Sequence, residues 1–137
     1  MTTTFRIGEV AELMGVSADT VRRWVDAGRL PAVRDDQARR VVRGADLATF
    51  ARALAATRPA GADDRHGVSS ARNRFRGIVT AVARDAVMAQ VEIQAGPHRV
   101  VSLMSREAAD DLGIEIGSLA VAVVKSTNVV VEVPARD

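Results

Sequence analysis

Residues 7–34 read IGEVAELMGVSADTVRRWVDAGRLPAVR, and this stretch decides the fold of the first half of the chain. Over residues 7–14 the larger apolar side chains recur at the spacing of one helix face, at Val10, Leu13 and Met14. Gly15 then interrupts the pattern, because glycine disfavours a helix interior. We therefore expect a short first helix that ends before Gly15.

A second helix is expected over residues 18–27. Ser17 is a favourable N-cap, since its side-chain oxygen can accept a hydrogen bond from an unpaired backbone N–H of the first turn. Asp19 suits the positive end of the helix, and Gly28 is placed to end it in a left-handed conformation. Two short helices joined by a three-residue turn that contains glycine are typical of a helix-turn-helix.

A short β-hairpin, or wing, is expected next, with strands at residues 30–34 and 39–43 around a turn at residues 35–38. A third helix over residues 46–56 follows, with Leu47, Phe50 and Leu54 directed inward. Residues 1–56 are thus predicted to form a winged helix-turn-helix domain.

From residue 75 onward the pattern changes to period two and is rich in valine, which is typical of strands. Residues 57–68 carry proline, glycine and a charged cluster without periodicity, and are predicted to be a linker. One short helix is expected at residues 105–112, among five strands at residues 75–83, 88–94, 98–104, 119–123 and 129–133. This order favours a five-stranded OB-type β-barrel over residues 69–137, and the fold class of the whole chain is α+β.

Composition excludes several classes of protein. The chain has no cysteine, so disulfides, thiolate metal sites and cysteine nucleophiles are excluded. We recognise neither a signal peptide nor the roughly 18 apolar residues of a membrane span, and expect a soluble cytoplasmic protein. His66 and His98 lack a second ligand at suitable spacing, so no bound metal cation is expected. Because no nucleophile–base arrangement or phosphate-binding glycine motif occurs, the protein is not expected to be an enzyme.

The second helix and the wing carry the candidate DNA-binding residues. Arginines on the open face of the helix could bond guanine edges or phosphates in the major groove. The alternative is a solvated face with Asp19–Arg23 and Arg22–Asp26 ion pairs. Five arginines between residues 29 and 43 favour DNA. The candidates are Ser17, Thr20, Arg22, Arg23, Arg39, Arg40 and Arg43.

Residues 5–56 resemble the MerR/excisionase class of winged helix-turn-helix domains. The resemblance runs along the stretch quoted above, through Trp24 and the Gly-x-Leu-Pro segment at residues 28–31. It implies binding of double-stranded DNA by the second helix and the wing. The wing turn, DDQARR at residues 35–40, departs from the glycine-rich turns that are usual in this class.

Two short segments of the second half indicate a different ligand. Residues 70–73 read Ser-Ala-Arg-Asn, and residues 125–128 read Lys-Ser-Thr-Asn. Lys125 is the only lysine of the chain, against eighteen arginines. A tetrahedral oxyanion without protons needs only hydrogen-bond donors, which hydroxyls, backbone N–H groups and an ammonium supply. The segments therefore favour an oxyanion site, the alternative being an ordinary surface lysine.

The motifs SARN-x-F-x-G and VVKSTNVVVEV, with SREAADDLGIEIGS between them, resemble the molbindin family, also called Mop or TOBE domains. The resemblance spans nearly all of residues 69–133 and implies binding of molybdate, or of tungstate, between subunits or paired barrels. By position it implies Ser70, Ala71 and Arg72 from one barrel with Lys125 and Ser126 from its neighbour. Ser105 is a further candidate. The alternative is a barrel that only dimerises.

The sequence therefore predicts a molybdate- or tungstate-responsive DNA-binding transcriptional regulator, similar in logic to the ModE regulators. Its expected parts are a DNA-binding domain at residues 1–56, a linker at 57–68 and an oxyanion-binding barrel at 69–137. Because one barrel offers half of a shared site, at least a homodimer is expected. Two alternatives remain, an intracellular molybdate-binding or storage protein and an excisionase-like DNA-binding protein whose barrel only oligomerises.

Overall fold

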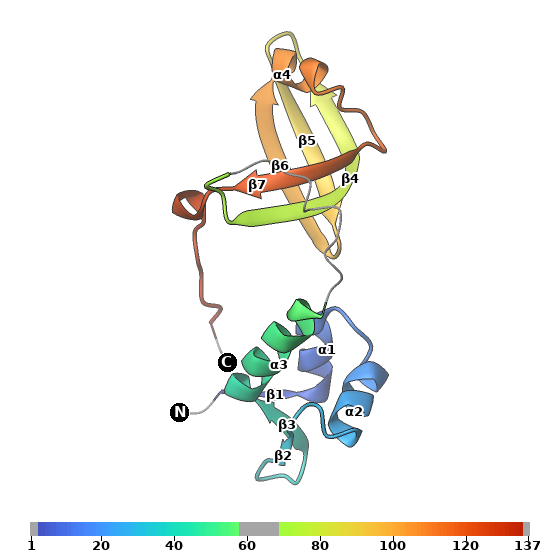
Figure 1. The fold of residues 1–137 in the computed structure, drawn as a ribbon, viewed down its shortest axis with the longest axis vertical. Helices are drawn as coiled ribbons and strands as arrows, with labels where there is room; N and C mark the ends of the chain where they lie inside the picture. Colours follow the sequence, from blue (N-terminus) through green and yellow to red (C-terminus); the bar gives the residue numbers. More distant parts are fainter. Residues whose placement is uncertain (1–2, 58–68, 136–137) are drawn as a thin grey trace. The chain divides into compact units, whose positions relative to one another are not determined.

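The computed structural model describes residues 3–57 and 69–135, so the predicted linker lies, apart from Thr57, outside the described residues. The chain divides into two compact units, Met1–Gly61 and Ala62–Asp137 (Figure 1), and each is described by itself. Within the described ranges, no helix is long and apolar enough to cross a membrane.

The first unit combines three helices with a three-stranded sheet in the order β1-β3-β2 (Figure 1). Its elements are β1 (Thr4–Arg6), α1 (Ile7–Met14), α2 (Ala18–Asp26), β2 (Val33–Arg34), β3 (Arg40–Arg43) and α3 (Gly44–Ala56). The core is built from the buried side chains of Val10, Ala11, Val21, Leu30, Val42, Leu47 and Phe50. Trp24 packs on this core with its ring centroid 4.8 Å from that of Phe50.

Local capping sets the boundaries of the first two helices. Gly15 follows α1 with a φ of 68°, and the Ser17 side chain accepts a hydrogen bond from the backbone N–H of Thr20 at the start of α2. Gly28 adopts a φ of 74° just after α2, a conformation that costs glycine little. The predicted helix at residues 7–14 is confirmed, and the one at 18–27 ends one residue earlier, at Asp26.

The hairpin predicted around residues 35–38 forms between β2 and β3 without a glycine in its turn. The Asp35 carboxylate accepts hydrogen bonds from the backbone N–H groups of Gln37 and Arg39, each at 2.9 Å. Ala38 takes a φ of 60°, and Arg34 donates to its carbonyl at 2.7 Å. Hydrogen bonds that the Asp35 side chain accepts thus hold a turn that a glycine-rich sequence would make through backbone freedom.

Strand β1 has no counterpart among the predicted elements. It is only three residues long, too short to show a period, and it exists because it pairs antiparallel with β3, Phe5 opposite Val42. Its last residue, Arg6, stands immediately before α1. The strand therefore places the Arg6 side chain beside the start of α1, a position that sequence periodicity does not predict.

The second unit is a curled four-stranded antiparallel sheet in the order β6-β5-β4-β7 (Figure 1). Its elements are β4 (Asn73–Arg84), β5 (Met88–Ala95), β6 (His98–Ser105), α4 (Arg106–Asp111), β7 (Leu119–Val124) and a 3₁₀ turn, η2 (Ser126–Asn128). The first half of β4 pairs with β7 and its second half pairs with β5, with a register shift between Val79 and Ala81. The core inside the curl is centred on Val79, Val91 and Ile93.

The predicted fifth strand, at residues 129–133, is wrong. This segment forms no strand in the described structure, and its valines are 46–90% exposed. Alternating valines predict an extended chain, but a strand also needs a hydrogen-bonded neighbour, and these residues pair with neither of the sheet's edge strands, β6 and β7. The predicted five-stranded barrel is therefore, within one chain, a curled sheet of four strands.

The apolar side chains of β7 also face differently from those of β5. On β5 the larger apolar residues Val91 and Ile93 are buried in the core. On β7 it is Ala120 and Ala122 that pack against the core, whereas Leu119, Val121 and Val123 are exposed. The outer face of β7 therefore carries apolar surface that one chain does not cover.

Candidate functional site

The N-cap and the open face of α2 carry four of the predicted DNA-contacting residues, Ser17, Thr20, Arg22 and Arg23. The hydroxyls of Ser17 and Thr20 lie 3.0 Å apart, and Arg23 donates to the Thr20 hydroxyl at 3.2 Å. Arg22 pairs with Asp19 at 2.7 Å, so the Asp19–Arg23 pair of the solvated alternative does not form. Both partners are more than half exposed, and such a pair is worth little. Arg22 can therefore exchange Asp19 for a phosphate or a base edge.

The arginines of the hairpin are held by acidic side chains. Arg39 pairs with Asp35 at 3.0 Å, and Arg40 pairs with Asp26 at 2.8 Å, which ties β3 to the end of α2. Asp26 therefore pairs with Arg40, and not with Arg22 as it would if α2 only presented a solvated face. Arg43, at the other end of β3, directly precedes α3 and is not placed with Arg39 and Arg40.

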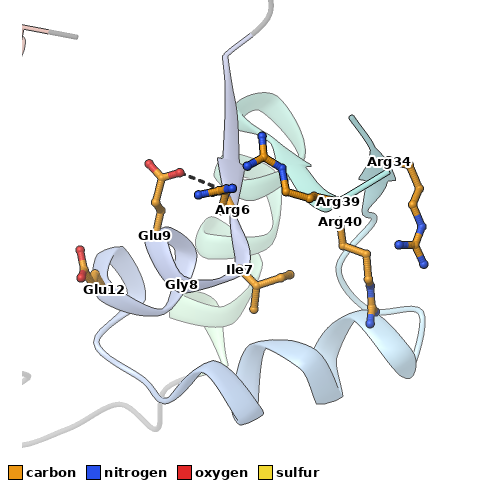
Figure 2. A pocket seen from close by; sticks show the side chains of 8 residues that line it. All are labelled: Arg6, Ile7, Gly8, Glu9, Glu12, Arg34, Arg39 and Arg40. Carbon is orange, nitrogen blue, oxygen red and sulfur yellow. Dashed lines mark hydrogen bonds between the residues drawn. The ribbon is translucent and has the colours of Figure 1, made fainter. Parts of the chain in front are cut away.

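A broad hollow lies between the start of α1 and the β2–β3 hairpin (Figure 2). Four arginines line it, with Glu9 and Glu12 on its α1 side, the arginines being Arg6, Arg34, Arg39 and Arg40. Glu9 accepts a hydrogen bond from the backbone N–H of Arg6 at 3.1 Å. The hollow is basic and adjoins the predicted DNA-contacting residues, which suits a phosphate backbone. Arg6 and Arg34 are the cations of the hollow that are not among the candidate residues named from the sequence, although Arg34 is one of the five arginines counted between residues 29 and 43.

In the second unit the two motif segments meet at one end of the sheet. Asn73 of β4 stands opposite Val124 of β7, and its side-chain amide donates to the Val124 carbonyl at 3.1 Å. Continuing this antiparallel register by one residue sets Arg72 opposite Lys125. The sequence predicts these two segments as contributions from different subunits, whereas the fold already brings them together within one chain.

Hydrogen-bond donors gather around this end of the sheet, and two of them have local acceptors on Ser69. The backbone N–H of Ala71 donates to the Ser69 hydroxyl at 3.1 Å, and Arg72 donates weakly to the Ser69 carbonyl at 3.4 Å. Ser126 opens the turn η2, directly after Lys125. Ser70, Arg72, Lys125 and Ser126 are exposed. This end of the sheet thus offers two cations and two hydroxyls.

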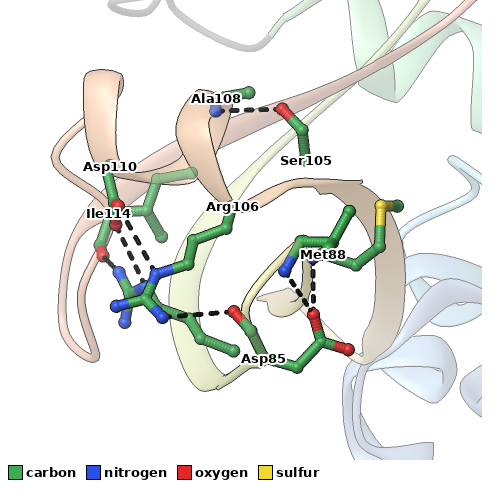
Figure 3. Close-up of polar contacts among 9 residues, drawn as sticks. Asp85, Met88, Ser105, Arg106, Ala108, Asp110 and Ile114 are labelled. Carbon is green, nitrogen blue, oxygen red and sulfur yellow. Dashed lines mark hydrogen bonds and ion pairs between the residues drawn. The ribbon is translucent and has the colours of Figure 1, made fainter.

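Ser105 is not part of this cluster. It stands opposite Met88 on β5, at the end of the sheet where the second half of β4 finishes. Its side chain accepts a hydrogen bond from the backbone N–H of Ala108 at 3.0 Å and so caps α4 (Figure 3). Within one chain its role is structural.

The surroundings of Ser105 form a polar network that also has a structural explanation (Figure 3). Backbone N–H groups of Met88 and Val87 donate to Asp85 and hold the pKa of that carboxyl below its ordinary value. Arg84 and Arg106 both pair with Asp110, at 3.4 and 3.7 Å. These contacts close the β4–β5 turn and fix α4. Nowhere in residues 3–57 and 69–135 do three or more acidic or histidine side chains gather as a metal site would need.

An apolar groove runs between the two edge strands of the curled sheet. It is lined by side chains from β5, β6, β7 and the segment after α4, among them Ile93, Val101, Leu112, Leu119, Val121 and Val123. Several of these are well exposed, Leu119 by 66% and Leu112 by 69%. Apolar surface of this kind on an open sheet edge is typical of an interface.

Two family models match the chain, one on each unit. Residues 4–55 match a helix-turn-helix domain, and residues 69–131 match the TOBE domain. The two matches join a helix-turn-helix to a TOBE domain in a single chain, as the sequence predicts.

Relatives of the second unit are named for molybdenum. Molybdenum-pterin-binding protein 3 of Clostridium pasteurianum is 41% identical over 63 residues, which is 45% of this chain and 93% of that protein. The molybdenum transport protein ModE of Herbaspirillum seropedicae is also 41% identical over 63 residues, 45% of this chain but only 23% of its own length. Among solved structures, MopII from C. pasteurianum is 34% identical, with a TM-score of 0.45 over 48% of this chain and all of its own.

Proposed function

We propose that this chain, which belongs to the TOBE domain family through residues 69–131, is a molybdate-responsive regulator that binds double-stranded DNA. The observation that carries the proposal is the union, in one chain, of a helix-turn-helix with a domain whose relatives include molybdenum-pterin-binding proteins. The molybdenum transport protein ModE is a further relative of that same domain. The proposed activity is binding rather than catalysis, and the proposed location is the cytoplasm.

The proposed ligand site lies where β4 begins and β7 ends. Ser70, Arg72, Lys125 and Ser126, with the backbone at Ala71, supply donors and no carboxylate, which suits molybdate or tungstate. These dianions carry no proton at neutral pH, so a site made only of donors prefers them to anions that must donate. Ser105 could join such a site only from a second copy of the chain.

We propose further that the second unit assembles the protein as a homo-oligomer. The open edges β6 and β7, the apolar groove between them and the exposed valines of residues 129–133 supply the two sides of a strand-addition contact between copies. A two-fold assembly would place two recognition helices one DNA turn apart, about 34 Å. The groove would then be covered, and the exposed segment would gain the neighbour that it lacks in one chain.

Molybdate and tungstate are expected to stabilise the second unit, and sulfate much less. Sulfate is also an unprotonated tetrahedral dianion, but it is smaller, so fewer of the donors can reach its oxygens at the same time. At a concentration 100 times Kd, binding to the folded state alone stabilises it by about 2.7 kcal/mol, which raises the melting temperature of a domain of this size by several degrees. Thermal melting with each anion at equal ionic strength measures the effect. Equal shifts of the melting temperature with all three anions would show that the site binds anions only through unspecific charge attraction.

Arg22→Ala and Arg40→Ala are expected to weaken DNA binding in different ways. Arg22 stands on α2, so its loss should alter the preference for one DNA sequence over another. Arg40 stands on β3, so its loss should weaken binding to all sequences and lower the slope of log affinity against log salt concentration by about one. Arg52→Ala removes an exposed arginine from α3 and is the matched control. Unchanged binding isotherms for both test variants would exclude this face as the DNA contact.

Coupling between the two ligands tests the function as a whole. Molybdate is expected to change operator affinity by roughly 5- to 150-fold, the usual range of allosteric coupling, and operator DNA must change molybdate affinity by the same factor. Operator titrations at fixed salt, with and without saturating molybdate, measure it. Molybdate binding without DNA binding would identify a storage protein. DNA binding without any molybdate effect would identify an excisionase-like protein whose second unit only oligomerises.

A further inference from the structure

Arg74 of β4 has an unusual environment. Its side chain is half-buried, and its Nε is buried without any hydrogen-bond acceptor. Among the side-chain nitrogen and oxygen atoms of the described residues it is the one in this condition. A buried donor left without an acceptor costs about 1–3 kcal/mol. The sequence gives no signal for this residue, because arginine is common throughout the chain.

The neighbours of Arg74 are the cations of the proposed oxyanion site. Arg74 stands opposite Val123, and the last pair of the ribbon is Asn73 with Val124. Extending this register by one more pair sets Arg72 opposite Lys125, two pairs from Arg74 and therefore on the same face of the β4–β7 ribbon. Residues directly opposite each other in such a ribbon are about 5 Å apart at Cβ, and diagonal neighbours about 7–8 Å. Three cationic side chains therefore converge on one patch.

No ion pair neutralises this patch. All the ion pairs found within residues 3–57 and 69–135 involve other arginines. Like charges placed across from each other destabilise a sheet, and an unpaired donor adds to the cost. A dianion with four acceptor oxygens would relieve both, because it balances the charge and accepts from the buried Nε.

We infer that Arg74 is a further ligand-binding residue of the oxyanion site, donating through its Nε and guanidinium to a molybdate or tungstate held beside Arg72 and Lys125. This inference rests on the proposed function and names a donor of the same site. Guanidinium presents several donors in a fixed planar fork, so Arg74 can contact two oxygens of one tetrahedral anion. The affinity for oxyanion is thus built into the strand itself and not only into its flanking loops.

Arg74→Met tests the inference, because methionine keeps the length and apolar stem of the side chain but removes every donor. Without anion, the variant is expected to be as stable as the parent or more stable, since the unpaired buried donor is gone. With molybdate, its affinity is expected to fall roughly 10- to 150-fold, as for loss of a hydrogen bond to a charged group. Calorimetric titration and melting of the full chain give both quantities.

Arg76→Met is the matched control, because Arg76 lies on the same strand and face, two residues further from Lys125, and is exposed. Its molybdate affinity is expected to change less than threefold. An equal loss in both variants would mean general electrostatic attraction and overturn the role of Arg74. A loss of anion-free stability with unchanged affinity would make Arg74 a packing residue and also overturn it. If the parent chain itself binds no molybdate, the proposed function fails first.

Discussion

Gly77→Ala is expected to destabilise the curled sheet strongly while leaving the helical unit intact. A Cβ at position 77 would meet the carbonyl group of Gln94, with its carbonyl carbon 2.8 Å away, and the Ile93 side chain at 2.9 Å. Backbone at that distance cannot move aside without breaking the pairing of Ile78 with Gln94. Overpacking of this kind costs about 1–3 kcal/mol and sometimes more, a large part of the stability of a small domain.

The two units can be followed separately in this experiment. Trp24, the only tryptophan of the chain, lies in the first unit, so its fluorescence reports that unit alone. Gly77→Ala should leave the fluorescence transition unchanged and remove or strongly lower the β-sheet transition seen by circular dichroism. Gly96→Ala is the control, because the added Cβ meets nothing within 4 Å and only its φ of 57° is strained, at about 1 kcal/mol. Similar losses in both variants would show that close packing at Gly77 is not the cause.

Gly77 also explains a motif. It is the glycine of SARN-x-F-x-G, and it stands where β4 passes from its pairing with β7 to its pairing with β5. Only a residue without Cβ allows the backbone of β5 to come so close at this bend. The motif residue therefore fixes the curl that carries Asn73 and its neighbours to the end of β7.

The sequence correctly predicts the features that depend on contacts between residues close together in the chain. Ser17 caps α2 and Ser105 caps α4 through contacts three residues away, and Gly28 takes the left-handed conformation that its position after α2 requires. Such contacts need no knowledge of the rest of the chain. The hairpin at residues 33–43 is also predicted from the sequence, although its turn is held by hydrogen bonds to Asp35 and not by a glycine.

What the sequence misses depends on pairing between distant segments. β1 exists only because β3 is beside it, whereas residues 129–133 are not a strand because no strand of the described residues pairs with them. Alternation reports which residues would share a face, but it does not report whether a partner is present. The same limit explains β7, where alanines and not the larger Leu119, Val121 and Val123 face the core.

The residues of the candidate site also fall into those that the sequence predicts and those that only the structure reveals. Ser70, Arg72 and Lys125 are recognisable as donors in short motifs, yet their meeting within one chain follows from the β4–β7 register. Ser105 is a further candidate in the sequence and lies, within one chain, at the opposite end of β4, because the motif gives its place in the chain but not in the sheet. Arg6 and Arg74 had no signal at all, since one needs β1 and the other the burial of a single atom.

Lys125→Met is expected to lose most of its oxyanion affinity while remaining folded and oligomeric. Lys125 is exposed, takes part in no side-chain hydrogen bond or ion pair within the described residues, and follows β7 instead of lying in it. Removing its ammonium therefore leaves the fold unchanged. The proposed site, however, loses a compact charge that no other lysine replaces, and a charge-assisted hydrogen bond of this kind is worth about 1.5–3 kcal/mol, or roughly 10- to 150-fold in Kd.

Lys125→Arg separates charge from shape in the same position. Guanidinium keeps the positive charge but is larger and planar, so this variant should regain part of the affinity and not all of it. Molybdate titration of the three proteins gives the order parent, Lys125→Arg, Lys125→Met, and their anion-free melting temperatures should agree within about a degree. Wild-type affinity in Lys125→Met would remove Lys125 from the site. A lowered anion-free melting temperature of Lys125→Met would instead assign Lys125 a structural role, since removal of an exposed side chain without partners should leave the stability of the protein unchanged.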